Sequence, residues 1–148
     1  MIVTFIIEGE PHGKGRHRTT RTGHTYTPPK TVAYESKVKA CYMERTIGEA
    51  LQGPLKATIE AYYTIPKSRS KKVKEEMRKN LVRPTKKPDA DNVSKSVLDA
   101  LNGLAYKDDS SVVELIVNKY WADEGFVKVT LEEMGSVKEY DELKRSMK

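Results

Sequence analysis

The spacing of apolar and polar positions changes along the chain, and each spacing predicts one kind of element. Residues 55–65 alternate apolar and polar side chains without a break, which is typical of a strand with one buried face. Residues 2–7 are all β-branched or aromatic, with apolar side chains on both faces, so we expect a central strand there. Residues 112–121 and 126–131 are also strand-like, and the Asp-Glu-Gly sequence at 123–125 predicts an antiparallel hairpin between them.

Helices are predicted where apolar residues recur three or four positions apart. The Pro-Pro pair at 28–29 suits the start of a helix that we expect to run from about residue 30 to residue 50. A second amphipathic helix is expected over 91–104, with charged residues opposite its apolar stripe. The stripe of the first helix is predicted to contain Val32, Tyr34, Val38, Cys41, Tyr42, Ile47 and Leu51.

The remaining segments are polar, and they separate a core from its appendages. Residues 10–27 combine three glycines, three histidines and four basic residues, so we expect a long exposed basic loop. Residues 66–87 form a basic arm, and within it 68–80 is predicted to be a short surface helix or a partly mobile segment. The fold class is therefore α+β, a small mixed β-sheet packed with helices in a single domain over 1–134, followed by a charged C-terminal tail over 135–148.

Length and composition exclude several classes of protein. The chain has 148 residues, which is enough for one hydrophobic core. It contains no apolar run near the roughly 20 residues that span a bilayer, and its first segment reaches Glu8 too soon for a signal peptide. The single cysteine, Cys41, has no partner for an internal disulfide. We therefore expect a cytoplasmic protein that does not contact membranes.

The net charge of +6 is unevenly distributed. Residues 11–40 carry +6 and residues 66–87 carry +8, whereas residues 88–148 carry −5. Two basic blocks before an acidic half indicate a polyanionic partner, most simply nucleic acid, although a lysine-rich solvated surface is the ordinary alternative. The side chains expected to hold a DNA backbone are Lys14, Arg16, Arg18, Arg21, Lys71, Lys72 and Lys74.

The basic loop lacks the spacing of a known phosphate loop or metal site. The residue after Lys14 is glycine, where a phosphate loop requires a Ser or Thr that binds the metal. His12, His17 and His24 lack ligand spacing and cysteine partners, so they are interpreted as solvated or phosphate-contacting side chains. The loop is thus a candidate contact for nucleic-acid phosphates rather than a nucleotide or zinc site.

Four aspartates stand where a catalytic metal site is most plausible. Asp89 and Asp91 flank the start of the second helix, and Asp108 and Asp109 follow its end. Each alone could be a helix cap or a turn residue. Together, beside a basic segment, they concentrate negative charge near a phosphate-binding surface, which favours Mg²⁺, with Mn²⁺ as the alternative ion. Lys95, one turn after Asp91, is either an ion-pair partner or a group that holds the scissile phosphate.

Residues 87–103, KPDADNVSKSVLDALNG, and 106–113, YKDDSSVV, resemble the RusA family of Holliday junction resolvases. The resemblance implies a RusA-like fold. It also implies that Asp89, Asp91 and Asp109 are catalytic Mg²⁺-binding carboxylates, that Asp108 is a further candidate ligand, and that Lys95 is the catalytic lysine. The implied assembly is a homodimer that makes paired nicks in a four-way DNA junction. Such proteins are frequent in phages and prophages, and the N-terminal loop departs from the best-known members.

The sequence therefore predicts a crossover junction endodeoxyribonuclease, a Mg²⁺-dependent hydrolase that acts on branched DNA in recombination and repair. Its expected products carry 5′-phosphate and 3′-hydroxyl ends. Two alternatives stay open. One is a non-catalytic nucleic-acid-binding module in which the acids are only caps and turns. The other is a general structure-dependent nuclease that acts on flaps or forks through the same site.

Overall fold

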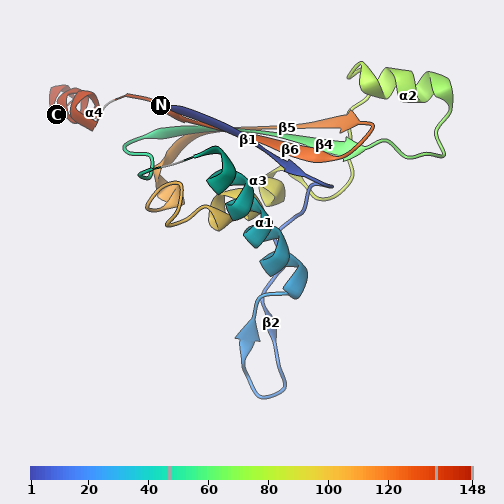
Figure 1. Cartoon of the computed structure of the whole chain (residues 1–148), viewed down its shortest axis with the longest axis horizontal. Coiled ribbons are helices and arrows are strands. Elements are labelled where there is room, and N and C mark those ends of the chain that lie inside the picture. The colour runs from blue at the N-terminus through green and yellow to red at the C-terminus, as the bar shows by residue number, and fades with distance from the viewer. Residues whose placement is uncertain (47, 136, 148) are drawn as a thin grey trace.

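The computed structural model describes residues 1–46, 48–135 and 137–147, together with their side chains except those of 137–140. Helices α1 and α3 lie against one face of a four-stranded sheet, while a thin hairpin, α2 and α4 extend away from it (Figure 1). The elements are β1 (Ile2–Glu8), β2 (Arg18–Thr19), β3 (Thr25–Tyr26), α1 (Pro29–Arg45), β4 (Leu55–Thr64), α2 (Lys71–Arg78), α3 (Ala90–Ala100), a short 3₁₀ turn (Asp109–Ser111), β5 (Val112–Ala122), β6 (Phe126–Glu133) and α4 (Val137–Ser146). The predicted α+β class with a mixed sheet is confirmed.

Strand β4 is the centre of the sheet, whose order is β1-β6-β4-β5. It runs antiparallel to β6 and parallel to β5. Every second side chain of β4 is buried, as the strict alternation predicted, because that face packs on the helices. The buried residues of β4 are Leu55, Ala57, Ile59, Ala61 and Tyr63.

The predicted hairpin between the last two strands is wrong, because β4 lies between β5 and β6. The connection at residues 123–125 crosses the end of β4. There the Gly125 N–H donates to Thr64 Oγ1 at 2.9 Å, and the Ile65 N–H donates to the Ala122 carbonyl at 2.9 Å. A Gly-containing turn specifies that the chain reverses direction. It does not specify whether a third strand is inserted between the two arms.

The prediction of a central first strand is also wrong, since β1 lies at the edge of the sheet, next to β6. Val3, Phe5 and Ile7 are buried against the helices, whereas Ile2 and Ile6 are 64% and 51% exposed. The helices cover one face of the sheet, so apolar residues on the other face of an edge strand stay in contact with solvent.

Both predicted helices extend too far at their C-terminal ends. α1 ends at Arg45, because Thr46 has extended backbone angles, and α3 ends at Ala100. Apolar residues beyond each end are buried from turns instead: Leu51 is 4% exposed and its N–H donates to the Ala105 carbonyl at 2.8 Å. The apolar spacing thus continues past the end of each helix into the turns that follow.

The predicted stripe of α1 is correct at its centre. Tyr34, Val38 and Tyr42 are buried and Cys41 is partly buried, whereas Val32 is 49% exposed. Ile47, also predicted for this stripe, lies outside the described residues.

The polar appendages follow the prediction more closely. The loop 10–27 is mostly exposed and carries the two short strands β2 and β3, which pair at Arg18 with Tyr26 and at Thr19 with Thr25. The arm contains the surface helix α2, attached through buried Met77. Among the described residues, no helix is both long enough and apolar enough to cross a membrane.

Candidate active site

The start of α3 presents two carboxylates that the helix itself does not use. Asp89 occupies the N-cap position, but its side chain accepts no capping hydrogen bond, and only its carbonyl receives the Val93 N–H, at 3.0 Å. Asp91 lies in the first turn, and both carboxylates are exposed. The helix N-terminus favours negative charge there. Because both carboxylates are exposed and the cap does not use that of Asp89, both groups are available to a ligand.

The sheet fixes the segment that leads into Asp89. The Tyr63 hydroxyl on β4 donates to the carbonyl of Pro88, which follows a cis peptide bond. Lys119 on β5 donates from Nζ to the Lys86 carbonyl at 2.6 Å. Burial, together with the charges of Asp89 and Glu10, raises the pKa of Tyr63 to about 12, so the phenol stays protonated and remains a donor at neutral pH.

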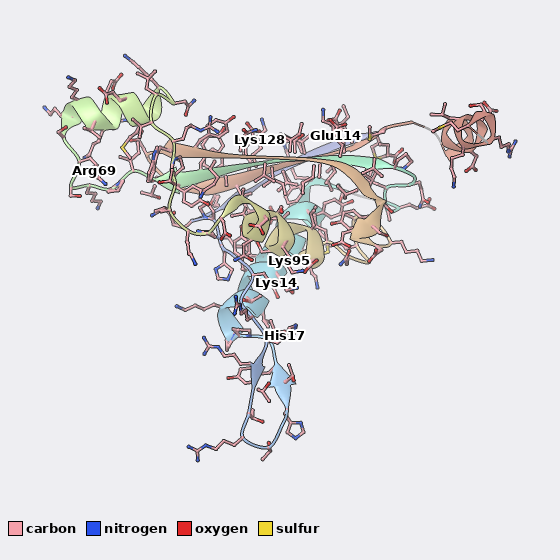
Figure 2. All side chains as sticks on the ribbon, turned by 180° about the vertical axis from the view of Figure 1, so that it is seen from behind. Lys14, His17, Arg69, Lys95, Glu114 and Lys128 are labelled. Carbon is pink, nitrogen blue, oxygen red and sulfur yellow. The ribbon has the colours of Figure 1, made fainter. Side chains whose placement is uncertain are left out.

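A cavity of about 620 Å³ opens between the start of α3 and the basic loop. Figure 2 shows Lys95 on α3 beside Lys14 and His17 of the loop. Carboxylates on the helix therefore face cations on the loop, an arrangement suited to a phosphate ester with a cation between it and the acids. The lining residues are Lys14, Gly15, Arg16, His17, Lys87, Asp89, Asp91, Asn92 and Lys95.

The loop is attached to α3 by specific contacts. The Lys14 N–H donates to Asn92 Oδ1 at 3.1 Å, and Ser96 Oγ donates to the His12 carbonyl at 2.7 Å. Gly13 lies so close that an added Cβ would be 2.3 Å from Asn92 Nδ2 and 3.0 Å from Pro88 Cβ. The absence of a side chain at Gly13 thus allows the loop to pack directly on the start of α3.

Lys14 is inside this assembly rather than on an open surface. Its Nζ lies 2.7 Å from Asp99 Oδ2 and 3.5 Å from Glu35 Oε1, and 20% of the side chain is exposed. Burial opposes the charged ammonium, but the hydrogen bond and charge of Asp99, with a further contribution from Glu35, prevail and raise the pKa of Lys14. Lys14, predicted as a DNA contact, thus links the loop, α1 and α3.

Asp109 lies at the other end of α3. Its N–H donates to Asn102 Oδ1 at 2.8 Å, and its carboxyl shares a hydrogen bond with that of Asp99. Burial is the largest cause that raises the pKa of Asp109, and the hydrogen bond to Asp99 and the charge of Asp108 raise it further. Asp108 accepts from the Ser110 N–H at 3.0 Å, an ordinary turn contact.

The predicted catalytic residues therefore form two groups. Asp89, Asp91 and Lys95 line one cavity, whereas Asp109 pairs with Asp99. Lys95 joins the groups, since its Nζ is 3.8 Å from Asp99 Oδ2. Within the described residues, no three His, Cys, Asp or Glu side chains are gathered closely enough to hold a metal ion. The carboxylate oxygens are nevertheless hard donors, the type that Mg²⁺ prefers.

Sequence reasoning missed Asp99, which is the residue that connects these groups. Its side chain is 19% exposed and contacts Lys14 and Lys95. The available signal was its position, two helical turns after Asp91 and one after Lys95 on the same polar face. Its partner Lys14 is 85 residues away in the chain, so no local pattern could indicate that pair.

The other predicted DNA contacts lie in two places. Arg16 lines the cavity, while Arg18 and Arg21 are exposed on the projecting β2–β3 hairpin (Figure 1). Helix α2 lies at one end of the sheet, away from the hairpin, with Lys71 and Lys72 exposed. Lys74, on the same helix, is half-buried.

Comparison with known proteins identifies the family of this chain. Residues 8–132 match the model of the family described as endodeoxyribonuclease RusA. The chain is a member of the RusA endodeoxyribonuclease family. It is also 40% identical over 139 residues to the uncharacterized protein YqaN of Bacillus subtilis, a match that covers 90% of this chain and 98% of YqaN. The resemblance drawn from residues 87–113 is confirmed, and the RusA match includes the loop, α3 and β5.

Proposed function

We propose that this RusA family member is a crossover junction endodeoxyribonuclease that resolves Holliday junctions by paired hydrolysis of phosphodiester bonds. The observation that carries the proposal is the pair Asp89 and Asp91, which line a cavity rimmed by cations and whose carboxylates are not used as helix caps. A module that only binds DNA has no need of two unpaired carboxylates where phosphate must approach, because they repel it. The proposed cellular role is DNA recombination and repair in the cytoplasm, with a prophage as the proposed setting.

The donor chemistry fits Mg²⁺, with Mn²⁺ as the alternative ion. Asp89 and Asp91 would hold the ion, Asp109 would be the third carboxylate, and Asp108 is a further candidate. An ion of this kind activates a water molecule and stabilises charge on the leaving oxygen. Asp109 comes from the far end of α3 in the same chain or from a second subunit.

Lys95 is proposed to contact the scissile phosphate. Its side chain is 64% exposed at the cavity and only weakly tied to Asp99, at 3.8 Å. An exposed ammonium one turn from Asp91 has free donors for phosphate oxygens and can stabilise negative charge as the bond breaks.

The proposed grip on DNA has two parts. Arg16, Arg18 and Arg21 contact the backbone near the cavity, and Lys71, Lys72 and Lys74 contact it at the far end of the sheet. The Lys14 side chain is 20% exposed and lines the cavity, so we propose that Lys14 contacts DNA only through this exposed part. Two such chains are proposed to act as a homodimer, because symmetric paired nicks in a four-way junction need two sites.

Asp91→Asn tests this function. The wild type is expected to nick a four-way junction in the presence of Mg²⁺ and to lose this activity in EDTA. The variant is expected to lose at least about 100-fold in nicking rate, because it loses a charged oxygen ligand, while its affinity for the junction stays within a few-fold. The matched control is Glu114→Gln on β5, a carboxylate on the opposite side of the sheet from Lys95 (Figure 2). Unchanged nicking in Asp91→Asn would remove the catalytic assignment.

Substrate choice is tested in the same assay with a four-way junction, a flap, a fork and plain duplex of matched sequence. Junction resolution predicts paired, symmetric nicks in the four-way junction and slow cleavage of the others. Equal rates on flaps or forks favour the general structure-dependent nuclease. Binding without cleavage of any substrate favours the non-catalytic module.

A further inference from the structure

Three cations beside the C-terminal half of β5 form a group that we call the cationic strip: Arg83, Lys86 and Lys119. The Arg83 guanidinium lies 4.2 Å from the ring centroid of Tyr120, and its Nε donates to the Lys119 carbonyl at 2.5 Å. The Lys86 ammonium lies 5.9 Å from the centroid of Trp121. Aromatic rings and main-chain carbonyls therefore hold these side chains in place.

Lys119 brings the strip to the active site. Its Nζ lies 5.0 Å from the centroid of Tyr63 and uses one of its three donors on the Lys86 carbonyl. Tyr63 in turn donates to the carbonyl of Pro88, directly before Asp89. Burial lowers the pKa of Lys119, and the nearby charge of Asp89 opposes this shift.

The strip differs from Lys14 and Lys95 in its neutralisation. Lys14 and Lys95 both pair with Asp99, and Arg78 pairs with Asp123. Arg83, Lys86 and Lys119 form no ion pair with any described residue. Positive charge that is fixed in position and not neutralised attracts an anion at small entropic cost, because the side chains are already ordered.

The rings also indicate what part of a nucleic acid the strip recognises. The cations occupy positions over the ring faces of Tyr120, Trp121 and Tyr63, so those faces are not free for stacking on bases. The four Nη donors of Arg83 have no partner among the described residues and match the oxygens of a phosphate.

We propose that the cationic strip binds backbone phosphates of the DNA beside the scissile bond, and so guides the strand to be cleaved along β5 to Asp89. This inference rests on the proposed function for its substrate. It adds a binding surface made of residues from the arm and β5, separate from the hairpin and from α2. The strip acts by positioning the strand and reads no base sequence.

The double variant Arg83→Gln with Lys119→Gln tests the strip by binding of a four-way junction in EDTA at several salt concentrations. Each lost phosphate contact reduces the slope of log affinity against log salt by about 0.9, so the slope is expected to fall by about 2. The affinity at low salt is expected to fall at least ten-fold. The matched control, Lys56→Gln with Lys128→Gln, removes the same charge from β4 and β6 on the face of the sheet opposite Lys119, where Figure 2 shows Lys128, and is expected to change the slope by less than about 0.5.

A variant that retains charge separates recognition from folding. Arg83→Lys with Lys119→Arg is expected to keep most of the slope, even if its melting temperature falls. If the Gln pair keeps the wild-type slope, or if the charge-retaining pair loses as much slope as the Gln pair, the strip does not bind phosphates. Wild-type protein that binds junctions through the strip but nicks none of them leaves the strip in place and overturns the nuclease function. Wild-type protein that binds no DNA overturns both.

Discussion

Both ends of α3 carry acidic side chains, but those at one end have side-chain partners and those at the other end have none among the described residues. At the N-terminal end, Asp89 and Asp91 are exposed and make no side-chain hydrogen bond or ion pair with the described residues. At the C-terminal end, Asp99 contacts Lys14, Lys95 and Asp109. Charges with partners hold the elements of this site together, whereas the carboxylates without partners are those that we propose to bind a metal ion.

The difference has a physical cause. Two carboxylates two residues apart repel each other, and the helix N-terminus offsets only part of that repulsion. A protein tolerates such a pair more readily where a cation compensates it in the working state. The contacts of Lys14 with Asp99 and Glu35 at the other end are partly shielded from water and hold the loop, so their removal is expected to affect stability more than chemistry.

Lys14→Met gives the largest expected change in stability. It leaves Asp99 and Glu35 without their shared cation in a poorly hydrated place, so the free energy of unfolding in urea should fall by about 2 kcal/mol. Lys95→Met is the matched control, because its side chain is 64% exposed and its contact with Asp99 is 3.8 Å long. That control should change stability by less than about 0.5 kcal/mol. Equal losses in both variants would mean that the two ends of α3 do not differ in this respect.

Gly13→Ala tests how the loop is attached to α3. The added Cβ would meet Asn92 and Pro88, so the loop must shift away from the start of the helix. The expected cost is about 1 kcal/mol in the urea midpoint analysis, as for other overpacked sites. Asn92→Ala removes the closer of the two contacts, but it also removes the acceptor of the Lys14 N–H. Gly13→Ala should therefore cost less when it is measured against Asn92→Ala than against the wild type, and an equal cost in both backgrounds would place the strain elsewhere in the loop.

Much of the N-terminal group was predictable from sequence because it is local. Asp89, Asp91 and Lys95 lie within seven consecutive residues, and helical spacing alone puts Asp91 and Lys95 on one face. The central strand at 55–64 was equally clear, since one covered face produces strict alternation.

The C-terminal group was not predictable because its contacts are remote in sequence. Lys14 and Asp99 meet only after the loop packs on α3, and the insertion of β4 between β5 and β6 depends on pairing across more than 50 residues. The exposure of Ile6 on β1 has the same origin, since the one-sided cover of the sheet is a property of the whole fold. Local patterns specify elements, and tertiary packing decides their neighbours.

The pH dependence of stability should separate Asp99 from its neighbours. Burial opposes its ionisation, but the hydrogen bond and charge of Lys14, with Asp109 and Lys95, lower the pKa of Asp99 below its ordinary 3.8. A lowered carboxyl pKa stabilises the fold above the ordinary value, and this contribution is lost as the pH falls through the folded value. Asp99→Asn should therefore lose less stability than the wild type as the pH falls below about 4. Asp109, whose pKa is raised, contributes with the opposite sign. If the stabilities of Asp99→Asn and of the wild type change with pH in parallel, the titration of Asp99 and Asp109 is not linked to folding.

Asp91→Asn should have the smallest effect on stability, although we expect it to have the largest effect on cleavage. Its carboxylate gains from the helix N-terminus, by about 0.3–1 kcal/mol, but it loses through repulsion from Asp89. These contributions oppose each other, so the free energy of unfolding without metal should change by less than about 0.5 kcal/mol. Adding Mg²⁺ should then stabilise the wild type more than the variant, because the proposed ion would bind only the folded site. Equal stabilisation of both proteins by Mg²⁺ would place the ion away from Asp91, and would remove the contrast between the two ends of α3.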